Sequence, residues 1–134
     1  MAFGPTIASA FDPVTVMRGV NTGSDRVFDR ERFLESVDGN VDLLHEFAQL
    51  FLKDCPRRLA ALREAVARRD REALEHAAHL LKGSAGYISA AAVFEAAEQV
   101  ETMARSGDLT EADEACARLQ EETRELAEAL AALE

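Results

Sequence analysis

The sequence predicts an all-α protein, folded as an antiparallel up-down four-helix bundle with a short additional helix at its N-terminal end. Three observations lead to this fold class. Apolar residues recur at three- and four-residue steps from residue 27 onwards, which is the helical period. Short loops separate the long helical stretches, so that neighbouring helices run antiparallel. The alternating pattern of a β-strand competes nowhere in the chain.

Length, composition and charge limit the class of protein. The chain has 134 residues, enough for one domain with a core, and its 48% apolar and 30% charged residues are typical of a globular protein. The formal net charge of −10 argues against nucleic acid as a partner, because phosphate binding requires a basic surface. It also argues against anionic membranes, and no run approaches the roughly 18 apolar residues of a membrane span.

The N-terminal part differs from the rest of the chain. Residues 1–26 hold two of the three prolines and three of the seven glycines without a sustained period, so we interpret them as a linker or loosely docked arm before a domain at 27–134. They lack the features of a signal peptide, which makes the cytoplasm the expected compartment. Cys55 and Cys116 lie in helical apolar patterns and are expected to be buried small hydrophobes rather than a disulfide.

A short helix is expected over about residues 29–37 and a long one over about 41–69. Asn40 can cap the long helix. Pro56 lies inside it and removes one backbone hydrogen bond, so we expect a kink near residues 52–56. The apolar stripe stays in phase on both sides of this proline, which favours one kinked helix over two. The residues of this stripe are Leu44, Phe47, Phe51, Cys55, Leu59, Leu62 and Val66.

Capping residues mark the next two helices. Asp70 is the expected N-cap of a helix over about residues 71–87. Ser89 is the expected N-cap of a helix over about 90–106. The inward side of the second of these helices is expected to consist of Val93, Ala96, Ala97, Val100 and Met103.

Gly107 is expected to end that helix, because glycine adopts the left-handed conformation that closes a helix. The run Thr110–Asp113 has the capping-box pattern and opens the last helix. The apolar stripe of the last helix consists of Ala112, Cys116, Leu119, Thr123, Leu126, Leu130 and Leu133.

The most informative stretch of the chain runs from His79 to Gly86. On a helix with about 100° per residue, Gly83 lies at about 40° from His79, Gly86 at about −20° and Lys82 at about −60°. The apolar residues of the same helix centre roughly 140° away. These apolar residues are Leu74, Ala78, Leu81, Ala85 and Ile88. These positions predict that the imidazole of His79 points outward, with the bare backbone of the two glycines beside it and the cation of Lys82 one turn further along the helix. We call these four residues the stripe of His79.

This stripe is either a solvated surface or a functional site. Each glycine inside a helix costs about 1 kcal/mol relative to alanine, and here two of them clear space beside His79. Lys82 is three residues on, where its ammonium can offset the charge of a phosphoryl group on the ring. Imidazole titrates near neutrality, so that an unprotonated nucleophilic nitrogen is available at physiological pH.

Residues 77–86 resemble the signature of histidine-containing phosphotransfer (HPt) domains, which runs alanine-histidine-any-leucine-lysine-glycine-serine-alanine. Val100–Glu101 followed by residues 106–108 is similar to the fourth helix of that family and its exit. Residues 51–56 are similar to its long second helix. The resemblance covers about residues 27–134.

The resemblance implies a phosphorelay carrier. His79 would accept a phosphoryl group from an aspartyl phosphate on a receiver domain and pass it to another receiver, while Lys82 steadies the phosphohistidine and Gly83 keeps the approach open. The partners implied are receiver domains of response regulators or of a hybrid histidine kinase. The chain would be a monomeric, stoichiometric carrier without cofactor, metal or ATP site of its own, and not an enzyme. Ser89 stands where the family usually has glycine, which is a departure at the turn.

Five residues around the stripe are candidates for docking the partner, namely Glu75, His76, Leu80, Gly86 and Tyr87. His76 is otherwise an ordinary exposed helix residue, which is the interpretation we favour for it. Leu80 and Tyr87, at about 100° and 80° from His79, either pack at the seam with a neighbouring helix or form an apolar rim for the receiver.

Two rival functions stay open at this point. The first is a helical protein-interaction module that is not phosphorylated. The second is a metal-binding bundle in which His76 and His79 bind metal with Glu72 or Glu75. The di-iron pattern needs Glu-x-x-His on two helices, and Ala73 precedes His76 by three residues, so metal binding is not expected.

Overall fold

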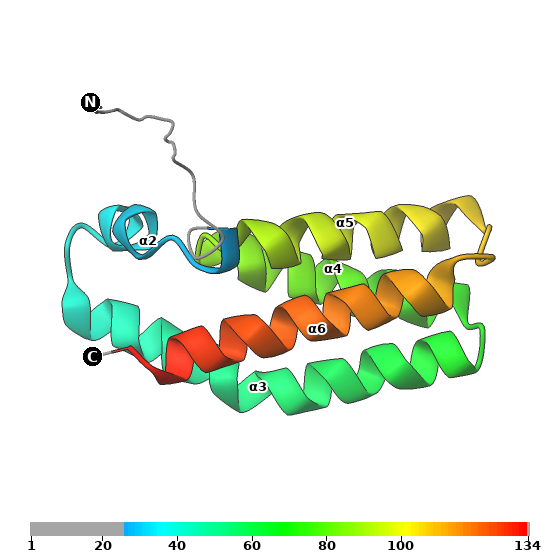
Figure 1. Cartoon of the computed structure of the whole chain (residues 1–134), viewed down its shortest axis with the longest axis horizontal. Coiled ribbons are helices and arrows are strands. Elements are labelled where there is room, and N and C mark those ends of the chain that lie inside the picture. Colours follow the sequence, from blue (N-terminus) through cyan, green and yellow to red (C-terminus); the bar gives the residue numbers. More distant parts are fainter. Residues whose placement is uncertain (1–25, 134) are drawn as a thin grey trace, which may run out of the picture.

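A computed structural model describes residues 26–133 and has five helices in this range (Figure 1). They are α2 (Arg30–Ser36), α3 (Val41–Ala67), α4 (Arg71–Tyr87), α5 (Ala91–Ser106) and α6 (Ala112–Ala131). The described range contains no strand. The predicted four-helix bundle with a short additional helix is thus confirmed. The interpretation of residues 1–26 as an arm falls, except for Arg26, outside the described residues.

The four long helices form a closed ring around one core. α4 packs against α3 and α5, and α6 completes the ring by packing against α5 and α3. None of the helices described is long and apolar enough to cross a membrane. The largest completely buried side chains are Phe33, Leu44, Leu62, Leu74, Leu81, Leu119, Leu126 and Leu130.

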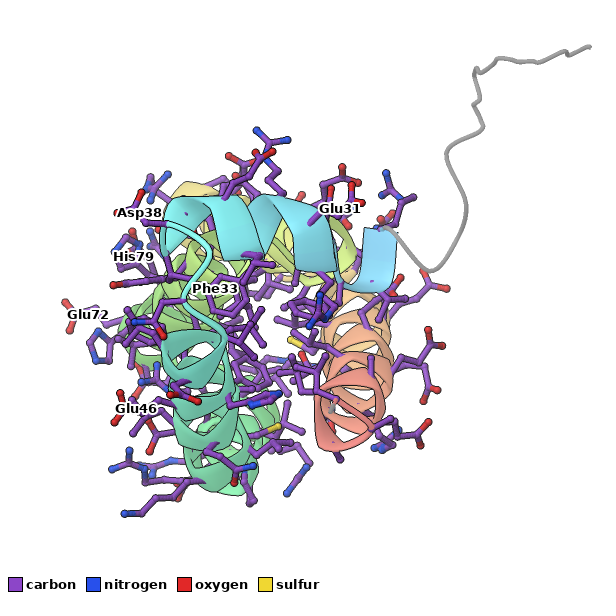
Figure 2. All side chains as sticks on the ribbon, turned by 90° about the vertical axis from the view of Figure 1, so that its left-hand side faces the viewer. Glu31, Phe33, Asp38, Glu46, Glu72 and His79 are labelled. Atoms are coloured by element: carbon purple, nitrogen blue, oxygen red, sulfur yellow. The ribbon has the colours of Figure 1, made fainter. Side chains whose placement is uncertain are left out.

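The short helix α2 lies across one end of this bundle (Figure 2). Asp29 caps it by accepting from the backbone N–H of Arg32. The backbone N–H of Asp29 also donates to the carbonyl of Ser89 at 3.0 Å, which joins the start of α2 to the α4–α5 turn. Phe33 is completely buried, and its ring lies 6.0 Å from those of both Phe28 and Phe47. These aromatic contacts cover the end of the core.

α3 is one continuous helix with Pro56 inside it, as the phase of its apolar stripe predicts. Asn40 is its N-cap and accepts from the backbone N–H of Leu43. The helix ends at Ala67, two residues before the predicted end. Arg69 adopts a left-handed conformation with φ of 56° and starts the turn to α4.

The turn between α4 and α5 corrects one prediction. Asp70 caps α4 as expected, but Ser89 does not cap α5, whose N-cap is Ala90 without a side-chain hydrogen bond. Ser89 has φ of 61°, which lets the N–H of Ala90 donate to the carbonyl of Ala85 at 2.8 Å and close α4. Glycine adopts this left-handed conformation most easily, so a serine at this turn carries backbone strain that a glycine would not.

The turn between α5 and α6 corrects a second prediction. Gly107 ends α5 in the left-handed conformation as expected. The capping box at 110–113 does not form, and α6 begins after Glu111 without a side-chain cap. Asp108 accepts instead from both the hydroxyl and the backbone N–H of Thr110, at 2.6 and 3.1 Å. The side chain of Thr110 is thereby bound to the turn before α6, and the N-cap position falls on Glu111 instead.

The predicted stripes supply most of the core, although Phe47, Met103 and Leu133 are only partly buried. Cys55 and Cys116 are buried and free, as the sequence predicts. Burial raises the pKa of both thiols, that of Cys116 to about 11. Both side chains therefore act as small apolar groups near neutral pH.

Substitution of Gly107 tests how α5 ends. An alanine Cβ there would lie 3.3 Å from the guanidinium of Arg71, which is held by hydrogen bonds to the last carbonyls of α5. We expect Gly107→Ala to lower the free energy of unfolding by more than the roughly 1–2 kcal/mol of left-handed backbone strain. Gly39→Ala is the matched control, because Gly39 also has positive φ but would place its Cβ in open space. If urea denaturation shows the same decrease in the free energy of unfolding for Gly107→Ala and Gly39→Ala, the contact with Arg71 does not add to the cost of the substitution.

Candidate functional site

His79 lies on the outer side of α4. Its side chain is 62% exposed, and in Figure 2 it lies at the edge of the bundle, as Glu72 does. The opposite side of the same helix is buried throughout at Leu74, Ala78, Leu81 and Ala85. The imidazole therefore stands on a rigid, well-packed helix and remains open to a partner.

The imidazole is not isolated, because α5 presents a buried carboxylate to it. His79 Nδ1 lies 2.8 Å from Oε2 of Glu101, and the side chain of Glu101 is only 4% exposed. Sequence reasoning did not assign Glu101 to the site. The signal was present, since Glu101 stands four residues after Ala97 and three before Ala104, on the buried side of α5.

Three other charged side chains complete this cluster. The ammonium of Lys82 lies 2.7 Å from Oε1 of Glu101. Arg105 donates from Nη2 to Oε2 of Glu101 at 3.0 Å and from Nε to Oε2 of Glu75 at 3.1 Å. Arg105 is a second residue that the sequence analysis missed. Glu75, expected as a docking residue, is thus also linked to the cluster.

These partners keep Glu101 ionised. The hydrogen bond from Lys82 is the largest influence, and with the bond from His79 it lowers the pKa of Glu101 against the opposing effect of burial. An ionised carboxylate only accepts hydrogen bonds, so the proton between the two side chains belongs to Nδ1 of His79. Nε2 then carries the free lone pair, and none of the described residues hydrogen-bonds to it.

Lys82 lies on the side of His79 that faces α5. Its side chain is partly buried, and its ammonium lies 5.9 Å from the centre of the Phe94 ring. In this structure the ammonium pairs with Glu101. The imidazole and the ammonium therefore bind the two oxygens of the same carboxylate.

The two glycines of the stripe differ in their surroundings. A Cβ on Gly83 would meet no atom within 4 Å, so the helix surface there is open. A Cβ on Gly86 would lie 3.4 Å from the ring of Phe94, which is ordinary contact. Bare backbone beside His79 is thus found at Gly83, whereas the space above Gly86 is bounded by an aromatic ring.

The remaining predicted residues lie on the flank that faces α3. His76 and Leu80 line a cavity of about 380 Å³ between α3 and α4. The arginines of this cavity are Arg57, Arg58 and Arg68. Tyr87 is 59% exposed, and its ring lies 4.7 Å from that of Phe47. The face around His79 thus has an ionic flank toward α5 and a mixed apolar and basic flank toward α3.

Residues 26–133 contain no group of three or more histidine, cysteine or carboxylate side chains that could hold a metal ion. His76 lies on the α3 flank, whereas Glu101 and its partners lie on the α5 flank. The two histidines that the metal hypothesis needs therefore face different neighbours.

Comparison with known proteins identifies one family. The family profile described as "Hpt domain" matches residues 46–133, which is more than half of the chain. None of the curated proteins is similar enough in sequence to match.

Two solved structures are similar in fold. Histidine-containing phosphotransfer protein B (HptB) from Pseudomonas aeruginosa PAO1 has 26% identity and a TM-score of 0.69, over 75% of this chain and 88% of that protein. The HPT domain from the Hpt sensor hybrid histidine kinase from Shewanella has 14% identity and a TM-score of 0.73, over 80% of this chain and 92% of that domain. The second likeness concerns the fold alone.

The ionised Glu101 predicts an acid-dependent part of the stability. Its pKa is lowered from 4.5, so its ion pairs stabilise the folded state fully above that value and are lost as the pH falls through the lower pKa of the folded protein. We expect Glu101→Gln to lower the free energy of unfolding by about 1–3 kcal/mol near pH 7. In urea denaturation this difference from wild type should shrink once the pH falls below 4.5. A difference that is constant with pH would contradict the role of the charge.

Proposed function

The chain belongs to the histidine-containing phosphotransfer (HPt) domain family, and we propose that His79 is the residue on which it carries a phosphoryl group. Proteins of this family perform histidine phosphotransfer in phosphorelays and are phosphocarriers rather than enzymes with their own ATP site. One observation carries the assignment to His79. It is an exposed imidazole whose Nδ1–H is bound by a buried carboxylate, which leaves Nε2 free toward the surface.

Nε2 is the nucleophile of the proposed step. Its lone pair forms a bond to the phosphorus of an aspartyl phosphate on a receiver, while the bond from phosphorus to the aspartyl oxygen breaks and the carboxylate leaves with the electron pair. The proton on Nδ1 stays in place, so the phosphorylated ring carries a positive charge. The carboxylate of Glu101, 2.8 Å from Nδ1, offsets this charge. The reverse step passes the group to a second receiver.

Lys82 and Gly83 support the same step in different ways. The ammonium of Lys82 is held beside the ring by Glu101 and offsets the negative charge of the phosphoryl oxygens. Gly83 leaves open space next to His79, which the acidic active site of a receiver needs to reach the ring. The divalent cation and the acidic cluster that drive the transfer belong to the receiver in this proposal, and this chain acts as a stoichiometric, monomeric carrier.

The partner would contact the face around His79. Leu80 and Tyr87 provide exposed apolar surface on the α3 flank, and Glu75, His76 and Gly86 surround the ring on α4. An apolar surface with a polar rim is typical of protein interfaces. We place the domain at residues 27–134, which includes α2 because Phe33 is part of the core.

Replacement of the nucleophile tests the assignment. We expect His79→Gln to abolish phosphate uptake from a radiolabelled, phosphorylated receiver domain, and the label on wild type to be acid-labile and base-stable, because N-phosphoryl bonds hydrolyse in acid. His76→Gln is the matched control on the same helix: since His76 lies in the proposed docking face, its loss can slow uptake, but the final amount of label should equal that of wild type. Equal labelling of wild type and His79→Gln would overturn the proposal and favour an interaction module that is not phosphorylated.

Gly83→Ala separates partner access from chemistry. The new Cβ meets open space, so the helix should gain about 1 kcal/mol in stability, or about 4 °C in Tm. We expect transfer from the receiver to slow by about tenfold, equivalent to about 1.4 kcal/mol in the transfer complex. Phosphorylation by phosphoramidate, a small donor, should be unchanged. Slowing with both donors would contradict a role in partner access.

A further inference from the structure

Two residues at the rim of the site carry an inference that rests on the proposed function of His79. We propose that Glu75 and Arg105 form a positioning pair, which sets how strongly Glu101 binds Nδ1 of His79 and thereby how reactive Nε2 is. In this role Glu75 acts through Arg105, and Arg105 acts through Glu101. Neither residue touches the phosphoryl group in the proposed step.

The geometry links the four residues in series. Arg105 donates from Nε to Glu75 at 3.1 Å and from Nη2 to Oε2 of Glu101 at 3.0 Å. This same Oε2 accepts from Nδ1 of His79 at 2.8 Å. Lys82 binds the other oxygen, Oε1, at 2.7 Å. Arg105 and His79 therefore compete for one carboxylate oxygen, and Lys82 does not take part in that competition.

The competition gives the two rim residues opposite effects. A carboxylate oxygen shared with a guanidinium is a weaker acceptor for a second donor, so Arg105 weakens the bond from Nδ1. Glu75 holds the Nε of Arg105 and leaves only Nη2 for Glu101. Without the charge of Glu75, the guanidinium is free to bind Glu101 with two N–H groups, which is its preferred geometry with carboxylates. Glu75 therefore strengthens the bond from Nδ1 indirectly.

Stability alone is a poor explanation for this pair. The side chain of Arg105 is 60% exposed and that of Glu75 is 38% exposed, and ion pairs that are open to solvent contribute little to folding. The one buried member of the series is Glu101, at the end that faces His79. Among residues 26–133, no carboxylate other than that of Glu101 pairs with the imidazole. The charged side chains that ion pairs link to the ring are those of Glu75, Lys82, Glu101 and Arg105, with His76 on the other flank.

The test uses the full chain with Glu75→Gln, Arg105→Gln and the double variant. The ¹⁵N chemical shift of His79 Nδ1 reports the strength of its hydrogen bond, and the rate of phosphorylation by phosphoramidate reports the reactivity of Nε2. We expect Arg105→Gln to strengthen the hydrogen bond from Nδ1 of His79 and to raise the rate by about threefold, the size of a modest coupling between neighbouring residues. Glu75→Gln should weaken the bond and lower the rate by about the same factor. The double variant should match Arg105→Gln.

Each other outcome also decides the matter. If Glu75→Gln changes the shift and the rate equally in wild type and in Arg105→Gln, the proposal is overturned, because Glu75 would then act without Arg105. If the two single variants change Tm but leave the ¹⁵N shift of His79 and the phosphoramidate rate unchanged, the pair has only a structural role and the proposal is overturned. Arg124→Gln is the matched control, since Arg124 forms a similarly exposed ion pair with Glu121 on α6 and should change neither readout.

Failure of this inference is distinguishable from failure of the proposed function. The ¹⁵N shift of His79 requires no phosphorylation, so it measures the positioning pair even in a protein that accepts no phosphate. A wild-type chain that phosphoramidate does not label would overturn the role of His79 as carrier. The opposite shifts in the two single variants would in that case still support the link from Glu75 to the imidazole.

Discussion

The site depends on one constraint, the burial of the carboxylate of Glu101 between α4 and α5. A carboxylate that is only 4% exposed is stable as an ion only when hydrogen-bond donors, some of them charged, occupy its lone pairs. His79 and Lys82 supply these donors from α4, and Arg105 supplies one from α5. The contacts that occupy the lone pairs of Glu101 join α4 to α5, and the contact with His79 also orients the imidazole. The same interactions therefore hold the helix pair together and place the proton on the ring.

The two flanks of α4 have different physical character. Toward α5, the contacts are short ionic hydrogen bonds, which suit the control of charge on the imidazole. Toward α3, His76 and Leu80 line a cavity and Tyr87 is exposed against Phe47. Such apolar and basic surface suits contact with another protein. His79 lies between the two flanks, where a docked partner can reach a ring whose proton is already placed.

The sequence-based predictions failed mainly at turns and at contacts between helices. Ser89 and Thr110 both have side chains that are typical of N-caps, but neither caps a helix. The backbone of Ser89 is left-handed, and the hydroxyl of Thr110 donates to Asp108, two residues before it. Whether such a side chain caps a helix or binds a neighbouring group instead depends on the backbone angles of a few residues. Asn40 and Asp70 form the predicted caps, because both have extended backbone and accept from the N–H three residues on.

The sequence by itself determined the helical bundle, its buried stripes and the outward position of His79. Each of these follows from the 3.6-residue period within one helix, which is a local property of the chain. Only the tertiary structure decided that Glu101 and Arg105 belong to the site, and that Glu75 and Lys82 bind them. Those contacts depend on the register between α4 and α5, which side-chain packing across the whole bundle sets and which no pattern within a single helix encodes.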